Sequence, residues 1–119
     1  MASLPNYLLT NRKHLALSQE EVAFLLGMNG EHKACKVSRD ETFAREPGLK
    51  DVLAYELLYG KPARELFAGV YEEVKQEMAR RAKFLTYRKA YDADPKRKEA
   101  IASLASKIIA KSNVHDSNQ

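Results

Sequence analysis

The segment LSQEEVAFLLGMNGEHKACKVSRDE, residues 17–41, decides the fold of this chain. Ser18 and Glu21 have the spacing of a capping box, in which each side chain accepts a hydrogen bond from the other residue's backbone N–H, so they predict a helix start. Apolar residues then recur at helical spacing up to Gly27, a typical helix end. Asn29-Gly30 is a turn dipeptide, and a helical pattern resumes after it. The segment therefore predicts two helices joined by a turn.

Three further helices are predicted in the N-terminal part of the chain. One follows Pro5 and runs to about Leu15, one runs from about Leu49 to Tyr59 and ends at Gly60, and ARELF forms a short fifth helix. Helical periodicity predicts which side chains share one face of each helix, a face that is expected to be buried in the second and fourth helices. They are Leu8, Leu9, Arg12 and Leu15 in the first helix, Val22, Ala23, Leu25 and Leu26 in the second, Ala34, Val37 and Glu41 in the third, and Leu49, Val52, Leu53 and Leu57 in the fourth.

The pattern changes after Gly69, where a long amphipathic helix is predicted. Its apolar stripe comprises Tyr71, Val74, Met78, Ala82 and Leu85. The segment from Asp92 to Pro95 breaks this helix, and Pro95 opens a last one, whose stripe comprises Ile101, Leu104, Ala105, Ile108 and Ile109. The polar tail from Ser112 is expected to be disordered. The prediction is an all-α chain with a domain over residues 1–69, a helical extension over 70–111 and a tail over 112–119.

Composition narrows the class of protein. The 119 residues carry a net charge of +4, and the excess lies in residues 70–111, which hold eleven basic and six acidic residues, whereas residues 1–69 hold nine of each. The sequence has no secretory signal and no membrane-spanning run, and its single cysteine, Cys35, fits a reducing compartment, so we expect a cytoplasmic protein. His32 and Cys35 alone are too few ligands for zinc. No catalytic constellation is present, so neither enzymatic activity nor a cofactor is expected.

The order LSQEEVAFLLG, then KVSR followed by Glu41, then REP followed by Leu49 resembles the XRE-type family of phage repressor and Cro proteins. The resemblance covers roughly residues 6–67 and implies a five-helix repressor-like helix-turn-helix domain. It also implies a largely buried ion pair between Arg12 and Glu41, which would fix the angle of the third helix. These two residues are therefore expected to be scaffold.

The resemblance further implies which residues meet duplex DNA. Gln19, at the start of the second helix, is placed to bind a phosphate, and Arg45, in the loop after the third helix, is another expected phosphate contact. Exposed basic and polar side chains of the third helix would reach base edges or phosphates. The DNA-contacting set is Gln19, Lys33, Lys36, Ser38, Arg39 and Arg45. A solvated charged surface explains these residue types equally well.

Two departures from the family pattern weaken these assignments. The interval from Gly27 to Val37 is ten positions where the family pattern has six, so four residues either lengthen the third helix by about a turn or enlarge the connecting turn. Asp40 is expected on the exposed face, where a carboxylate would repel phosphate unless it accepts from a cytosine amino group or pairs with Lys36.

Two functional hypotheses follow from the sequence. The first is a transcriptional regulator that binds double-stranded DNA through the third helix, as a homodimer joined by its C-terminal helices. An intramolecular hairpin of those helices is the alternative to dimerisation. The second hypothesis is a protein–protein interaction module on a helix-turn-helix scaffold that has lost sequence reading, which Asp40, Glu31 and the neutral N-terminal part favour.

Overall fold

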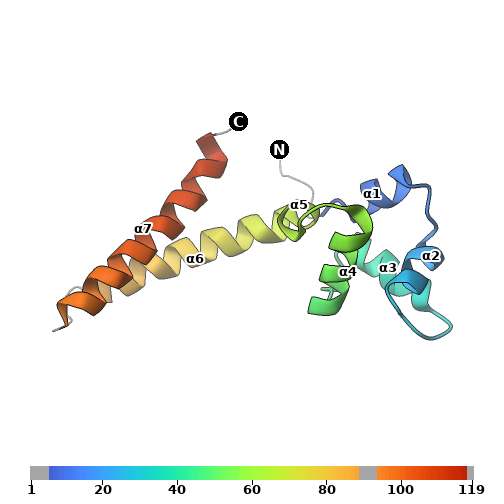
Figure 1. Ribbon diagram of the computed structural model, residues 1–119, viewed down its shortest axis with the longest axis horizontal. Coiled ribbons are helices and arrows are strands. Elements are labelled where there is room, and N and C mark those ends of the chain that lie inside the picture. The colour runs from blue at the N-terminus through green and yellow to red at the C-terminus, as the bar shows by residue number, and fades with distance from the viewer. Residues whose placement is uncertain (1–5, 89–93, 118–119) are drawn as a thin grey trace. The chain divides into compact units, whose positions relative to one another are not determined.

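The computed structural model describes residues 6–88 and 94–117, with the side chains of residues 6–88 and 94–112. All regular structure in these ranges is helical, as predicted. The chain divides into two compact units, residues 1–70 and 71–119, which are described separately. The helices are α1 (Leu8–His14), α2 (Gln19–Leu25), α3 (Lys33–Glu41), α4 (Leu49–Tyr59), α5 (Ala63–Leu66), α6 (Ala68–Arg88) and α7 (Pro95–Ser117) (Figure 1).

Local signals set several of the helix ends. The Ser18 hydroxyl accepts from the Glu21 backbone N–H, and the Glu21 carboxylate accepts from the Ser18 backbone N–H, so the predicted capping box starts α2. Gly27 follows α2 with φ 75° and Gly60 ends α4 with φ 66°, both in the left-handed region that glycine adopts without strain. The predicted start of α7 at Pro95 is also confirmed.

The extra residues after Gly27 enlarge the turn and do not lengthen the third helix. The last residue of α2 is Leu25 and the first of α3 is Lys33, so seven residues connect them. Gly30 has φ 105°, which no helix accommodates, and this conformation stops α3 from beginning earlier. The Lys36 ammonium donates to the Asn29 carbonyl oxygen at 3.3 Å and joins the turn to the first part of α3.

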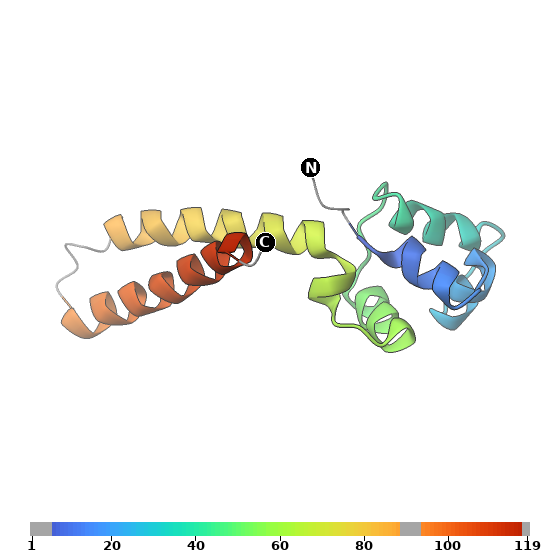
Figure 2. The same ribbon diagram turned by 90° about the horizontal axis from the view of Figure 1, so that it is seen from above.

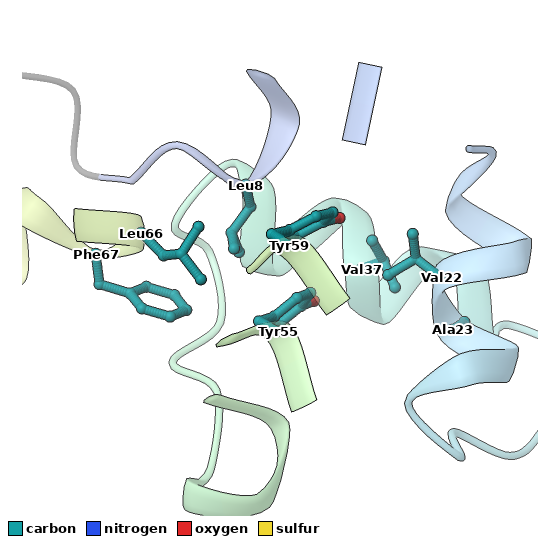
Figure 3. Packing of buried hydrophobic residues seen from close by; sticks show 8 residues of the cluster. All are labelled: Leu8, Val22, Ala23, Val37, Tyr55, Tyr59, Leu66 and Phe67. Carbon is teal, nitrogen blue, oxygen red and sulfur yellow. The ribbon is translucent and has the colours of Figure 1, made fainter. Parts of the chain in front are cut away.

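The core of the first unit lies where α1 to α5 converge. Its buried residues are Leu8, Val22, Ala23, Val37, Tyr55, Tyr59, Leu66 and Phe67. Figure 3 shows the two tyrosine rings between Leu66 and Phe67 on one side and Val37 on the other. The tyrosine rings stack with their centroids 6.0 Å apart, and Phe67 meets Tyr55 edge-on at 6.2 Å. Aromatic pairs in these geometries stabilise a core beyond the area they bury.

The predicted inward face of α4 is wrong, although the bounds of the helix are correct. Leu49, Leu53 and Leu57 are 75%, 55% and 86% exposed, while Tyr55 and Tyr59 point into the core. At 100° per residue, Leu53 and Tyr55 lie on opposite sides of the helix, so only one of the two can face inward. The Tyr55 hydroxyl donates to the buried Asp40 carboxylate at 2.7 Å, an interaction that no leucine can replace.

Smaller corrections apply to the first two helices. Leu25 was expected in the buried stripe of the second helix and is exposed, and Leu9 and Leu15, predicted to share a face with Leu8, are exposed too, whereas Leu8 and Val22 are fully buried. Both helices have only seven residues, so each offers the core a narrow stripe of about two side chains rather than a wide apolar face. Leu26, also expected inside, is partly buried against the core.

In the second unit, α6 and α7 run antiparallel and side by side, as Figures 1 and 2 both show. The buried residues at this contact are the small side chains Ala79, Ala82 and Ala105. Most of the large residues of the predicted stripes remain partly or largely exposed. The exposed ones are Tyr71, Val74, Met78, Leu85 and Leu104, and Ile101, Ile108 and Ile109 are half-buried.

Residues 112–117 are assigned to the end of α7, and the expectation of a disordered tail from Ser112 stays a prediction. The segment contains neither glycine nor proline, so nothing in it ends a helix that is already formed. Residues 118 and 119 lie outside the described residues, as does Asp92 of the predicted break. None of the described helices combines the length and apolar character that crossing a bilayer requires.

The two core tyrosines offer a matched pair of substitutions. The buried Tyr59 hydroxyl has no hydrogen-bond partner among the described residues, whereas the Tyr55 hydroxyl binds Asp40. We predict that Tyr59→Phe leaves the free energy of unfolding unchanged or raises it by up to about 1 kcal/mol, and that Tyr55→Phe lowers it by about 1–3 kcal/mol because it removes the shortest hydrogen bond to a buried carboxylate. Urea unfolding followed by circular dichroism measures both; equal losses would contradict this assignment.

Candidate nucleic-acid interface

The predicted ion pair between Arg12 and Glu41 is confirmed. Arg12 Nε donates to Glu41 Oε2 at 2.6 Å, and Arg12 Nη2 donates to Glu41 Oε1 at 3.2 Å. A third N–H of the guanidinium donates to the Leu17 carbonyl oxygen at 3.0 Å. This hydrogen bonding raises the pKa of Arg12, so the cation stays charged. A bidentate pair of this kind fixes direction as well as distance, and it joins α1 to the C-terminal end of α3.

Gln19 also hydrogen-bonds the Glu41 carboxylate. Its Nε2 donates to Glu41 Oε1 at 3.0 Å, and the side chain is half-buried. One carboxylate therefore accepts hydrogen bonds from the first residue of α2 and from the middle of α1. The side chain of Gln19 is held in place by this bond, and its predicted phosphate contact stays a prediction.

Asp40 does not lie on the exposed face of α3, so the expectation that it would repel phosphate is wrong. Its exposed fraction is 0%, and its carboxylate faces α4 rather than Lys36. Both carboxylate oxygens accept from Arg45 Nη1 at 3.1 Å, and Oδ2 also accepts from the Tyr55 hydroxyl at 2.7 Å. The reason is helical phase: Asp40 is three residues after Val37 and so shares its buried side.

The Asp40 site is a polar network within an otherwise apolar interior. Arg45 Nη2 donates to Asp51 at 3.0 Å, and Asn6 Nδ2 donates to the Asp40 backbone carbonyl oxygen at 2.9 Å. Burial raises the pKa of Asp40, an effect that the hydrogen bond from Tyr55 partly opposes. The network connects the N-terminal segment, α3, the following loop and α4. Full hydrogen bonding is the condition under which such a buried charge is tolerated.

Arg45 is consequently a member of the scaffold. Its guanidinium bridges Asp40 and Asp51, which together carry more negative charge than the arginine supplies. A side chain engaged in this way has fewer free donors for a phosphate than a loop arginine without partners. The structure gives Arg45 a role that the sequence did not predict, namely fixing the loop that leaves α3.

The outward face of α3 carries cations and no carboxylate. Lys36 and Arg39 are exposed, three residues apart on one face, and the exposed Cys35 lies beside Arg39, one turn before it. The only acidic residues of α3 are Asp40 and Glu41, and both are turned inward. The Arg39 side chain has no hydrogen bond or ion pair with any described residue. This face therefore presents one unengaged guanidinium and one ammonium to solvent.

The remaining predicted contact residues lie at the edges of this face. The Lys33 ammonium sits 5.6 Å from the centroid of the exposed Phe24 ring of α2. Ser38 is half-buried on the opposite edge. Two residues of the six predicted contacts, Lys36 and Arg39, thus share one outward face, whereas Gln19 and Arg45 are bound to carboxylates and Lys33 and Ser38 flank the helix.

Residue spacing in the sequence indicates the Asp40 network, but the apolar stripes alone do not. Val37 and Asp40 are three residues apart, and Val52, Tyr55 and Tyr59 have the same helical spacing as the leucines of α4. A polar residue in phase with a core position, together with a tyrosine in a competing stripe, indicates a buried hydrogen bond. The choice between the leucine stripe and the tyrosine stripe of α4 depends on the hydrogen bond between Tyr55 and Asp40.

The chemistry open to this surface is electrostatic and hydrogen-bonding recognition of an anion. Arginine and lysine on an exposed helix can donate to phosphate oxygens and to guanine edges. Among the described side chains, no three His, Cys, Asp or Glu groups gather closely enough to hold a metal ion.

Breaking the Arg12–Glu41 pair is predicted to destabilise the first unit. Arg12→Ala leaves a nearly buried carboxylate without its cation, and we expect a loss of about 3 kcal/mol in the free energy of unfolding. The exposed Lys13→Ala on the same helix is the control and should stay within about 0.5 kcal/mol of the unmodified protein. Urea denaturation measures both, and equal stability of the two variants would show that the pair is not a structural restraint.

No protein-family model matches this chain, and searches of curated proteins and of solved structures return no match either.

Proposed function

We propose that the chain binds duplex DNA through the outward face of α3, as a transcriptional regulator with a repressor-like helix-turn-helix in its first unit. The single observation that carries this proposal is the inward orientation of both carboxylates of α3. It leaves Lys36 and Arg39 as the charged groups of the outward face, and cationic side chains on an exposed helix suit a DNA groove. The DNA phosphates would attract these cations, and hydrogen bonds to base edges would make binding sequence-selective.

The restraint of α3 supports the same function. A helix that reads DNA must hold its contact residues in a fixed direction, because small displacements lose bidentate hydrogen bonds. Glu41 joins α3 to α1 and α2, and Asp40 joins it to α4. The enlarged turn before Lys33 changes how the N-terminal end of α3 would meet a groove, and Lys33 lies over the Phe24 ring, so we place the contacts at Lys36 and Arg39 rather than earlier in the helix.

We also propose that the protein is a homodimer joined through its α6–α7 hairpin. A groove of about 220 Å³ between these helices is lined by Met78, Arg81, Ala82, Leu85, Ile101, Leu104, Ala105 and Ile108. Because the hairpin buries mainly alanines, its larger apolar side chains still lack a partner. A second hairpin would cover this groove and complete a four-helix bundle. Two-fold symmetry would then match two half-sites on DNA.

An interaction module for another protein is the second candidate, and one observation favours it. Leu49, Leu53 and Leu57 form an exposed leucine row along α4, in the same unit as α3. An exposed apolar row of this length is typical of a protein contact. Co-purification with a partner, lost on Leu53→Gln and Leu57→Gln, together with no duplex binding at low salt, would favour this candidate over DNA recognition.

The proposed function is tested by selecting bound sequences from a random duplex pool. We expect enrichment of a motif with two-fold symmetry, because a dimer presents two copies of α3. A mobility-shift titration of the enriched duplex against a scrambled one then gives the specificity ratio at a stated salt concentration. Absence of any enriched sequence would refute sequence-specific recognition.

The dimer is tested by molar mass in solution. We predict a mass near twice the 13.5 kDa of one chain, measured by light scattering coupled to gel filtration. Leu104→Glu places a charge in the apolar groove and should give the mass of one chain, since an unpaired charge in an interface is costly. The matched control is Lys107→Glu, an exposed position of α7 outside the groove lining, which should leave the dimer intact. A single-chain mass for the unmodified protein would contradict the prediction.

Substitutions on α3 should distinguish residues that contact DNA from residues that stabilise the fold. We predict that Arg39→Ala and Lys36→Ala each weaken binding to the enriched duplex by about 1–3 kcal/mol, because each removes a donor to phosphate or base. Their thermal midpoints should stay near that of the unmodified protein, since both side chains are exposed. The exposed Lys61→Ala, outside α3, is the control for loss of charge alone. Unfolding of the α3 variants at ordinary temperature would show that these residues belong to the scaffold.

A further inference from the structure

The described part of α6 has three distinct faces after residue 75. One face packs on α7 through Ala79 and Ala82, and the half-buried Thr86 lies on the same face one turn further along. A second face, with Met78 and Leu85, lines the apolar groove. At 100° per residue, a third face is turned away from both. Its residues are Arg80, Phe84, Tyr87 and Arg88, with Lys83 at the edge, where it also lines a hollow against Ala102 and Ala105 of α7; we call these five residues the α6 stripe.

The α6 stripe combines cations with exposed aromatic rings. Phe84 is 62% exposed and Tyr87 is 78% exposed, so neither ring is used to hold the hairpin together. The Arg88 guanidinium lies 5.9 Å from the centroid of the Phe84 ring. Two neighbouring large aromatics in water, one of them under an arginine, are not what a merely solvated helix face requires.

No carboxylate neutralises the stripe from within. Residues 80–88, RRAKFLTYR, contain four basic residues and no acidic one. Glu77, one turn before and in phase with Phe84 and Arg88, pairs at 3.8 Å with Arg81, which borders the stripe. The stripe therefore keeps its positive charge, and charge complementarity calls for an anionic ligand.

From these observations we infer that the α6 stripe is a binding site for single-stranded nucleic acid, separate from the duplex-binding face proposed for α3. Lysine and arginine would neutralise phosphates, and the exposed rings of Phe84 and Tyr87 would stack on bases. A duplex keeps its base faces stacked inside, so it offers nothing for these rings to stack on. From Arg80 to Arg88 the helix rises about 12 Å, which spans about three nucleotides at about 3.4 Å per stacked base.

An anionic membrane surface is the competing ligand and fits less well. Helices that lie on membranes present a broad apolar face with cations at its edges. The stripe has only two apolar side chains, Phe84 and Tyr87, and they lie between Arg80 and Lys83 on one side and Arg88 on the other. Two rings bounded by cations suit bases flanked by phosphates better than a lipid boundary, which requires a wider apolar face.

The test is fluorescence anisotropy of the full chain with a labelled twenty-nucleotide oligo-dT, which has no duplex structure. The double variant Phe84→Leu/Tyr87→Leu keeps apolar volume and helix propensity while it removes both stacking surfaces, and we expect its affinity to fall about tenfold or more. Phe84→Tyr/Tyr87→Phe retains two rings and should bind as the unmodified protein does. Arg80→Gln/Lys83→Gln should reduce the slope of log affinity against log salt by about 1.4.

Controls separate this site from the rest of the molecule. Tyr71→Leu removes an exposed ring of the same helix off the stripe, and Lys61→Gln removes an exposed cation outside α6; both should leave oligo-dT affinity unchanged. Arg39→Ala should do the same, so failure of duplex recognition by α3 and failure of this site give different results. Circular dichroism checks that the leucine variant keeps its helix content.

Three results would overturn the inference. One is unchanged oligo-dT affinity in the leucine variant with its helix intact. Another is equal loss in the leucine variant and the Tyr71→Leu control. The third is binding to vesicles containing anionic phospholipid that depends on Phe84 and Tyr87 and exceeds the affinity for oligo-dT, which would assign the stripe to a membrane surface instead.

Discussion

Two consecutive carboxylates at the end of α3 hold the first unit together. Asp40 and Glu41 lie where the negative end of the helix dipole disfavours them, so local preference does not explain their position. Successive residues of a helix point about 100° apart, and this difference directs Glu41 to Arg12 of α1 and Asp40 to Tyr55 of α4. The helix is thereby restrained from two sides by charge-assisted hydrogen bonds, which fix direction more strictly than apolar packing does.

This restraint determines which residues of α3 remain outside. Once Val37, Asp40 and Glu41 are committed to the interior, the exposed side of the helix is left to Cys35, Lys36 and Arg39. The nine residues of α3 thus place their charges on opposite sides. The carboxylates of Asp40 and Glu41 are buried against guanidinium and phenol groups, and the cations of Lys36 and Arg39 face water. The electrostatic field of the outward face is set by this separation and not by the net charge of the unit, which composition alone gives as zero.

Sequence alone predicted the features that depend on neighbours in the chain or on a specific motif. These include the capping box of α2, the bounds of α4, the start of α7 and the Arg12–Glu41 pair. It failed where two stripes compete on one helix. In α4 the leucines are the more hydrophobic choice, but Tyr55 faces inward because it hydrogen-bonds a carboxylate fifteen residues earlier. Apolar periodicity counts only apolar side chains, so it could not show that Asp40 shares the buried side of Val37 or assign Arg45 to the scaffold.

The hairpin of the second unit follows from a different constraint, the size of the side chains at its contact. Ala79, Ala82 and Ala105 are the buried side chains where α6 and α7 meet, and side chains this small leave the larger residues beside them without cover. Met78, Leu85 and Leu104 are therefore left at the groove, and Phe84 and Tyr87 are left on the far side of α6. A single small-residue contact thus obliges the hairpin to expose an apolar groove and a cation–aromatic stripe, and each of these surfaces has the composition of a binding site rather than of a surface that only meets water.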